Sequence, residues 1–136
     1  MSPTFSIITP TWNRAHCVEK SIRSVLDQSF EDFEIIVFDD GSDDNTLNVV
    51  KGMVDERIVA KGNPKNNGVN FARNHAAKIA KGNWLIMLDS DDKLVPGALK
   101  KIKKDIDQLP EGAGLMFYGT LDERSNKMKS FSEKTS

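Results

Sequence analysis

Short apolar runs alternate along this chain with segments whose apolar residues recur at helical spacing, and this alternation restricts the fold most strongly. Residues 14–28 place several apolar side chains on one face of a predicted helix. Continuous apolar strands separated by helices are typical of a parallel sheet with both faces covered. We therefore predict an α/β fold with a mostly parallel sheet and helices on both faces. The predicted strands occupy residues 5–9, 34–38, 57–60, 84–88 and 114–120.

Three more helices are predicted after the second, third and fourth strands. The first has Asp44 as its N-cap, the second ends near Lys81, and the third begins at Pro96. The run at 84–88 is apolar throughout and predicts a buried strand. Residues 121–136 are polar, so we expect one domain over residues 1–120 followed by a mobile polar tail. The inward faces of the three helices are predicted to be Leu47, Val50 and Val54; Ala72, Ala76, Ile79 and Ala80; and Leu99, Ile102 and Ile106.

The charge balance and the cysteine content argue against several classes of function. Lysine and arginine number 19 and aspartate and glutamate 20, which gives no reason to expect a nucleic-acid partner. Cys17 is the only cysteine and cannot form an internal disulfide, which suits a reducing compartment. No apolar run approaches the roughly 20 residues of a membrane-spanning helix, and the first residues lack a signal-peptide pattern. We therefore expect a cytoplasmic domain without a transmembrane segment.

Polar and acidic segments follow three of the predicted strands. The first strand leads into TPTWNR, the second into DDGSDDNT and the fourth into DSDD. Because ligands of open parallel sheets bind outside the carboxyl ends of the strands, we expect these segments to form one site. Clustered carboxylates suit Mg2+ or Mn2+, and Mg2+ is usually held together with substrate phosphates. The chain lacks both the dinucleotide fingerprint and the P-loop, so we expect a metal to hold the phosphates.

Four segments, in this order and spacing, resemble the inverting glycosyltransferases called family 2. They are SIITPTWNR, FEIIVFDDGSDDNT, NNGVNFARN and GNWLIMLDSDD, and the resemblance covers residues 4 to about 120. It implies the Rossmann-like nucleotide-binding half of a GT-A fold and a nucleotide-diphosphate sugar donor, most often linked to UDP. It also implies a divalent cation (Mn2+ or Mg2+) and a saccharide or lipid-linked acceptor. Peripheral contact with the inner face of a membrane is compatible with such acceptors, and a homo-oligomer is a further expectation.

The resemblance assigns roles to individual residues of the four segments. Asp40 matches the carboxylate that recognises the base, and Asp39 precedes it. Arg73 matches a basic residue beside the nucleotide. In the D-x-D element, Asp91 for the ribose and Asp92 for the metal is the favoured register, with Asp89 and Asp91 as the other pairing. The predicted nucleotide-binding residues are Thr9, Pro10, Asn13, Arg14, Asp39, Asp40, Arg73, Asp89 and Asp91, and the predicted metal ligands are Asp91 and Asp92.

The family's catalytic base has no candidate in this sequence. It belongs to a segment after the fifth strand, and Asp122 and Glu123 follow that predicted strand too closely to take the role. The chain therefore resembles the donor-binding half of a longer enzyme, a natural truncation or a proteolytic fragment, and we expect it to transfer no sugar alone. A non-catalytic nucleotide-binding module is the alternative function. A phospho-aspartate receiver or phosphatase needs a carboxylate after the first strand, where Thr9, Pro10 and Thr11 stand instead.

Simpler interpretations remain open for single motifs. Asp39 and Asp40 also suit a turn, and DSDD suits a loop that caps a helix. A structural ion pair for Arg73 is as compatible with the sequence as a nucleotide contact. Trp12 fits either the nucleotide site or the edge of the sheet.

Overall fold

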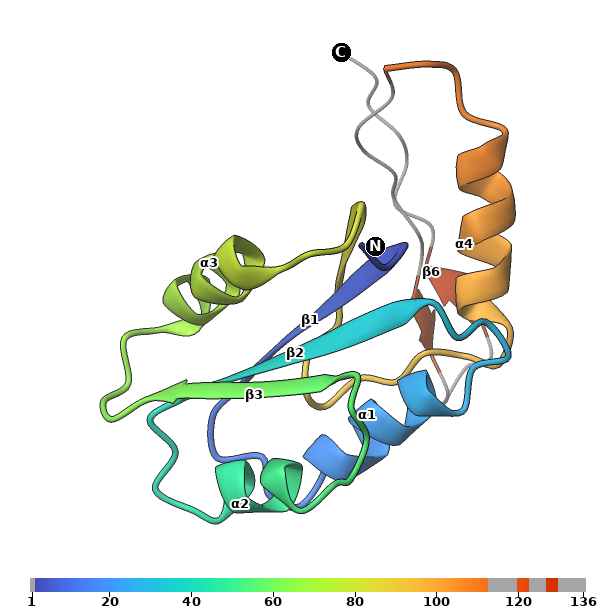
Figure 1. Cartoon of the computed structure of the whole chain (residues 1–136). Coiled ribbons are helices and arrows are strands. Elements are labelled where there is room, and N and C mark those ends of the chain that lie inside the picture. The colour runs from blue at the N-terminus through green and yellow to red at the C-terminus, as the bar shows by residue number, and fades with distance from the viewer. Residues whose placement is uncertain (1, 113–119, 123–126, 130–136) are drawn as a thin grey trace. The chain divides into compact units, whose positions relative to one another are not determined.

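The computed structural model describes residues 2–112, 120–122 and 127–129 (Figure 1). Contacts divide the chain into two compact units, residues 1–104 and 105–136, and each is described by itself. The predicted boundary of the domain at residue 120 stays a prediction. None of the described helices is both long enough and apolar enough to cross a membrane.

The first unit is built on a sheet of four parallel strands. These are β1 (Phe5–Thr11), β2 (Phe33–Asp40), β3 (Ile58–Asn63) and β4 (Trp84–Met87), in the order β3-β2-β1-β4. The β1–β2 pairing runs from Phe5 opposite Phe33 to Thr11 opposite Asp39. Since all three pairings are parallel, the carboxyl ends of the strands meet at one edge of the sheet. The predicted parallel α/β fold is confirmed.

Helices lie on both faces of this sheet, as predicted. The helices α1 (Val18–Leu26) and α2 (Thr46–Lys51) lie on one side, and α3 (Val69–Ile79) lies on the other (Figure 1). The helix α4 (Ala98–Asp107) follows β4 and buries Leu99 fully. Residues 14–17 form a turn before α1, in which the Val18 N–H donates to the Arg14 carbonyl, so the helix begins later than predicted.

The core packs α3 against the centre of the sheet. Ala72 and Ala76 are fully buried against Ile8, Ile36 and Phe38. Alanine at both positions lets the helix backbone come close to the strands, and continuous apolar strands supply the opposing surface. Burying such surface is the main favourable term in folding, at roughly 25 cal/mol per Å². This packing positions the amino end of α3 beside the carboxyl ends of β1 and β2.

Three predictions of burial are wrong. The strand β4 is half exposed, with Leu85 at 44% and Met87 at 53%, because these alternate residues share one face of the strand and that face is incompletely covered. On α3, Ile79 is 41% exposed, since it is the last residue of the helix and is not part of the buried cluster that includes Ala76. Val54 is fully exposed because α2 ends at Lys51, and Gly52 follows.

The second unit contains a hairpin, described here by itself. The strands β5 (Thr120–Asp122) and β6 (Lys127–Lys129) pair antiparallel, with Leu121 opposite Met128. The strand β6 was not predicted from the sequence, because three residues are too few for a visible periodicity. The predicted strand at 114–120 lies outside the described residues except for Thr120, which begins β5.

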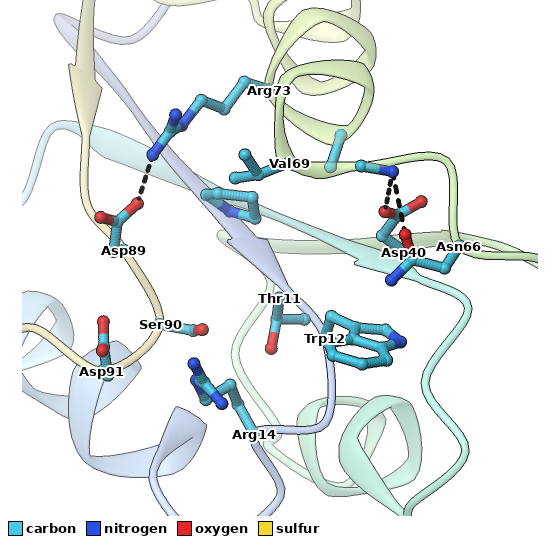
Figure 2. Close-up of a pocket in the computed structure, with 13 residues that line it drawn as sticks. Thr11, Trp12, Arg14, Asp40, Asn66, Val69, Arg73, Asp89, Ser90 and Asp91 are labelled. Carbon is cyan, nitrogen blue, oxygen red and sulfur yellow. Dashed lines mark hydrogen bonds and ion pairs between the residues drawn. The ribbon is translucent and has the colours of Figure 1, made fainter.

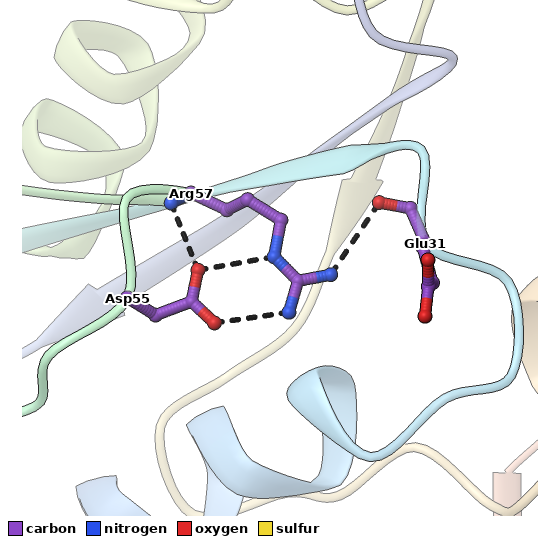
Figure 3. A network of polar contacts seen from close by, with 3 residues as sticks. All are labelled: Glu31, Asp55 and Arg57. Carbon is purple, nitrogen blue, oxygen red and sulfur yellow. Dashed lines mark hydrogen bonds and ion pairs between the residues drawn. The ribbon is translucent and has the colours of Figure 1, made fainter.

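An arginine network joins the amino ends of β2 and β3, away from the strand ends where the site is expected. The Arg57 guanidinium donates to both carboxylate oxygens of Asp55 and, at 3.4 Å, to the Glu31 carbonyl (Figure 3). It also lies 4.4 Å from the centre of the Phe33 ring. These contacts attach the loop before β3 to the start of β2, and we assign them a structural role.

Candidate functional site

A pocket opens where β1, β2 and β4 end and α3 begins (Figure 2). Its volume is about 330 Å³, within the range usual for small-molecule sites. This is the position predicted from the three polar segments, because the carboxyl ends of parallel strands lie at one edge of the sheet. The lining residues are Pro10, Thr11, Trp12, Arg14, Asp40, Asn66, Gly68, Val69, Ala72, Arg73, Asp89, Ser90 and Asp91.

The predicted site residues divide into two groups. Six of them line the pocket, so segments more than 70 residues apart in the sequence do meet there. The other four lie outside the lining, and three of these use their side chains within the protein or in the acidic cluster described below. The first group is Pro10, Arg14, Asp40, Arg73, Asp89 and Asp91, and the second is Thr9, Asn13, Asp39 and Asp92.

Asp40, the last residue of β2, organises the loop that precedes α3. Its side chain is buried, and its oxygens accept the main-chain N–H groups of Asn67 at 2.9 Å and Gly68 at 2.7 Å. The Asn63 amide is a weaker donor at 3.5 Å. Hydrogen bonds from N–H groups compensate the burial of a charged carboxylate. Asp40 therefore holds the loop in place while lining the pocket.

A second network connects the ends of β1 and β2. Asp39 accepts the N–H of Ser42 at 3.2 Å and also its hydroxyl group. The Ser42 hydroxyl accepts the Asn13 N–H at 2.8 Å, and the Asn13 side chain accepts the Asp43 N–H at 2.8 Å. Asn13 has a left-handed backbone with φ 52°, which asparagine tolerates better than most residues. These contacts fix the loops from which Trp12 and Arg14 reach the pocket.

Arg73 reaches across the pocket from α3 to the end of β4. Its Nη2 lies 2.9 Å from Oδ1 of Asp89, and the two side chains are 34% and 47% exposed (Figure 2). Its Nε is buried and has no protein partner among the described residues. The structural ion pair left open by the sequence is therefore present, in a position where Arg73 can also contact a ligand.

Asp89 also belongs to a compact acidic cluster with Asp91 and Asp92. One carboxylate oxygen from each can be chosen so that all three lie within 4.8 Å of one another. Burial, followed by the negative charges of Asp91 and Asp89, raises the pKa of the Asp92 carboxyl. Three close carboxylate oxygens form the hard donor set that Mg2+ and Mn2+ prefer, so the residues fit a divalent cation.

The first helix holds this acidic turn and the segment after it. The Ser21 hydroxyl donates to the Asp89 carbonyl at 3.3 Å, and the Ser24 hydroxyl accepts the Leu94 N–H at 3.0 Å. Gln28 is buried; its amide nitrogen donates to the Val95 carbonyl at 2.9 Å, and its oxygen accepts the Leu99 N–H at 3.2 Å. The position of the carboxylates thus depends on polar residues of α1 and on Gln28 just after it.

Several lining residues were not predicted from the sequence. Trp12, for which two positions remained open, lines the pocket and is 45% exposed, and Val69 is 50% exposed. Thr11 is buried, and its hydroxyl has no partner in the described part of the chain. Asn66 and Ser90 also line the pocket. The tryptophan after the first strand was the available signal, because ligand pockets are commonly lined by aromatic side chains.

Comparisons with known proteins agree with this geometry. The sequence model of "Glycosyl transferase family 2" matches residues 6–134. The GalNAc(5)-diNAcBac-PP-undecaprenol beta-1,3-glucosyltransferase of Campylobacter jejuni is 38% identical over 136 residues, covering 97% of this chain and 43% of the relative. The UDP-Glc:alpha-D-GlcNAc-diphosphoundecaprenol beta-1,3-glucosyltransferase WfgD of Escherichia coli is 41% identical over 95 residues, covering 70% of this chain and 38% of the relative. The chain thus spans about two fifths of the length of these relatives.

Solved structures share the fold. The crystal structure of S. aureus TarS 1-349 in complex with UDP-GlcNAc superposes with a TM-score of 0.75 at 29% identity. The match covers 84% of this chain and 37% of that one. The same protein in complex with UDP gives a TM-score of 0.74, also at 29% identity. The four-stranded parallel sheet and its helices therefore have the arrangement of these structures.

Proposed function

Because the chain belongs to glycosyl transferase family 2, we propose that its pocket binds the nucleotide-diphosphate sugar used by a glycosyltransferase. The observation that carries the proposal is the meeting of Asp40, Arg73 and the acidic cluster around one pocket at the strand ends. The names of the relatives support a UDP-linked donor, since WfgD is a UDP-Glc transferase and TarS was solved with UDP-GlcNAc. The proposed nucleotide-binding domain comprises residues 1–120.

The walls of the pocket suit a nucleoside. The Trp12 ring offers an apolar face for a planar base, and the exposed Val69 side chain is part of the same lining. Base stacking on an aromatic side chain is worth roughly 1–3 kcal/mol. Asp40, which ends β2 in the same pocket, can accept a hydrogen bond from a base N–H. Trp12 and Asp40 together therefore account for the base.

The opposite side of the pocket suits the ribose and the diphosphate. Arg14 lines it, and no ion pair holds its guanidinium within the described part of the chain. We assign Arg14 to a phosphate group, Asp91 to the ribose and Asp91 with Asp92 to a divalent cation. When bound, Mg2+ or Mn2+ neutralises charge on the diphosphate leaving group. Asp39 and Asn13 lie outside the pocket lining, and we infer that they act on nucleotide binding indirectly, by fixing the loops.

The acceptor is proposed from the relatives. Both named glucosyltransferases carry diphosphoundecaprenol or PP-undecaprenol in their names, which supports a saccharide on a lipid carrier. Such an acceptor would be met at a membrane surface. The cytoplasmic location, the homo-oligomer and peripheral membrane contact stay predictions.

Calorimetric titration of the 136-residue chain with UDP, with and without Mn2+, tests the proposal. We expect UDP to bind and to raise the melting temperature, because a ligand of the folded state stabilises it by mass action. Asp92→Asn should remove mainly the part of the affinity that depends on Mn2+. Asp43→Asn, an exposed aspartate outside the pocket, is the matched control. Absence of UDP binding by the unmodified chain at millimolar concentration would refute the proposed function.

A further inference from the structure

The side-chain amide of Asn66 has a fixed orientation beside Asp40. The Gly68 N–H donates both to Oδ2 of Asp40 at 2.7 Å and to Oδ1 of Asn66 at 3.0 Å. An N–H can face only an acceptor, so this contact determines which amide atom is the oxygen. The amide nitrogen, Nδ2, is then directed away from Gly68 and has no partner among the described residues. Figure 2 shows the amide beside Asp40 and near Trp12, with which it lines the pocket.

Asp40 retains room for one more donor. Three donors reach its two oxygens, from Asn67, Gly68 and, weakly, Asn63. An ionised carboxylate offers about four acceptor positions. Because a single N–H contacts both groups, the Asn66 amide and the Asp40 carboxylate are neighbours. The pocket therefore presents an acceptor and a donor side by side.

The backbone around Gly41 supports this placement. A Cβ atom on Gly41 would lie 2.5 Å from the Lys65 carbonyl carbon and 2.7 Å from the Asn66 nitrogen. The loop therefore packs directly on the end of β2, and Asn66 is held from two sides. A group positioned in this way loses little conformational entropy when it binds a ligand.

We propose that Asn66 is a specificity-determining residue that reads the base of the nucleotide, an inference that rests on the proposed nucleotide-binding function. Asp40 accepts the imide N–H of the base, and Nδ2 of Asn66 donates to the neighbouring exocyclic carbonyl, O4 of uracil. Cytosine presents the reverse pattern, an exocyclic amine beside a ring nitrogen acceptor. Against cytosine, the Asn66 donor would face the exocyclic amine, also a donor, and the Asp40 acceptor would face the ring nitrogen, also an acceptor. Both residues would remain unpaired, which gives strong discrimination between the two bases.

Calorimetric titration of the 136-residue chain with UDP and with CDP, both in the presence of Mn2+, tests this pairing. In the unmodified chain UDP should bind more tightly than CDP. Asn66→Ala should weaken UDP binding about five- to tenfold, the usual effect of losing one hydrogen bond. CDP binding should be unchanged or tighter, so the ratio of the two affinities falls. Melting of the ligand-free variant should be unchanged, since Asn66 is exposed and the Gly68 N–H keeps Asp40 as its acceptor.

Asn67→Ala is the matched control. Asn67 is the adjacent residue of the same type, lies outside the pocket lining, and binds Asp40 through its main-chain N–H. The exposed Asn67 side chain donates to the Lys65 carbonyl at 3.2 Å, so Asn67→Ala removes a hydrogen bond from the same loop without touching the pocket, and both affinities should be unchanged. Equal weakening of UDP and CDP by Asn66→Ala, or no change in either, would overturn the assignment to Asn66 and leave the proposed function standing. Failure of the unmodified chain to bind UDP would overturn both.

Discussion

Arg73 and Asp89 form an ion pair that spans the pocket, with 2.9 Å between Nη2 and Oδ1. The pair joins the first turns of α3 to the end of β4, although the residues are 16 positions apart. The two side chains are 34% and 47% exposed, and ion pairs this exposed usually contribute about 0–1 kcal/mol to stability. Its position across the site therefore matters more than its contribution to the fold.

Replacing Arg73 should separate these two contributions. Arg73→Ala should change the free energy of unfolding by no more than about 1 kcal/mol, measured by urea denaturation. It should weaken UDP binding about tenfold in titrations with Mn2+, because a charged donor is lost from the pocket. Arg23→Ala is the control, since Arg23 pairs with Glu19 at the same 2.9 Å on the exposed side of α1. Equal UDP affinities in the two variants would assign Arg73 a purely structural role.

The acidic cluster predicts an unusual dependence of stability on pH. The pKa of Asp92 is raised above its ordinary 3.8 by burial and by Asp91 and Asp89. The folded chain therefore binds this proton more tightly than the unfolded chain, and the ionised group destabilises the fold above its folded pKa. Without metal, Asp92→Asn should be more stable than the unmodified chain at neutral pH. The difference should shrink as the pH falls through the raised pKa towards 3.8.

Comparing the two chains by urea denaturation across this range isolates the effect. Asp44 has a lowered pKa because it accepts the Thr46 hydroxyl, and Asp55 has a lowered pKa because it accepts Arg57. Their stabilisation is lost as the pH falls through their folded pKa values, in both chains alike, so it cancels in the difference. Mn2+ affinity should rise with pH over the same interval as Asp92 ionises. A stability difference that grows on acidification would contradict this account.

The sequence was sufficient for the sheet and for the place of the site. Continuous apolar runs such as 35–38 identify buried parallel strands, and the carboxyl-end rule then brings Asp40 and Asp91 to one pocket. It was not sufficient for the exposure of Met87 or Ile79, because burial depends on which neighbours cover a face.

The different roles of adjacent residues within one motif could not be predicted from the sequence either. Asp39 and Asp40 are adjacent and chemically identical, yet one binds Ser42 and the other lines the pocket. Alternation along β2 directs their side chains to opposite faces, but the sequence does not say which face carries the ligand. Asn66 was missed because its role depends on a shared N–H of Gly68 that no spacing rule predicts.

The contact between Gly41 and the loop at Asn66 yields a third prediction. Gly41→Ala forces a side chain onto a backbone with φ 72° and into the Lys65–Asn66 peptide. We expect the strained backbone alone to cost about 1–2 kcal/mol and the clash to displace Asn66, weakening UDP binding. Gly97→Ala is the control, because Gly97 also has a positive φ, 78°, but nothing lies within 4 Å of its Cβ position. Gly97→Ala should lower stability and leave UDP affinity unchanged. Equal UDP affinities of Gly41→Ala and Gly97→Ala would contradict the packing argument.

Asp40→Asn should lower both stability and binding, whereas Asp91→Asn should weaken binding without lowering stability. In Asp40→Asn, the side chain has one acceptor oxygen for the N–H groups of Asn67 and Gly68, and its NH2 group must face one of them; Gly68 keeps Asn66 as a second acceptor, but both N–H groups lose the charged acceptor. The Asp40 carboxylate is buried, and losing a hydrogen bond to a charged group costs about 1–3 kcal/mol. Asp91 is exposed, and Asp91→Asn removes charge from the cluster without breaking a described hydrogen bond. Urea denaturation without ligand should therefore show a loss for Asp40→Asn only, while titration with UDP and Mn2+ should show weaker binding for both. Unchanged stability of Asp40→Asn would mean that the loop before α3 does not depend on the carboxylate at the end of β2.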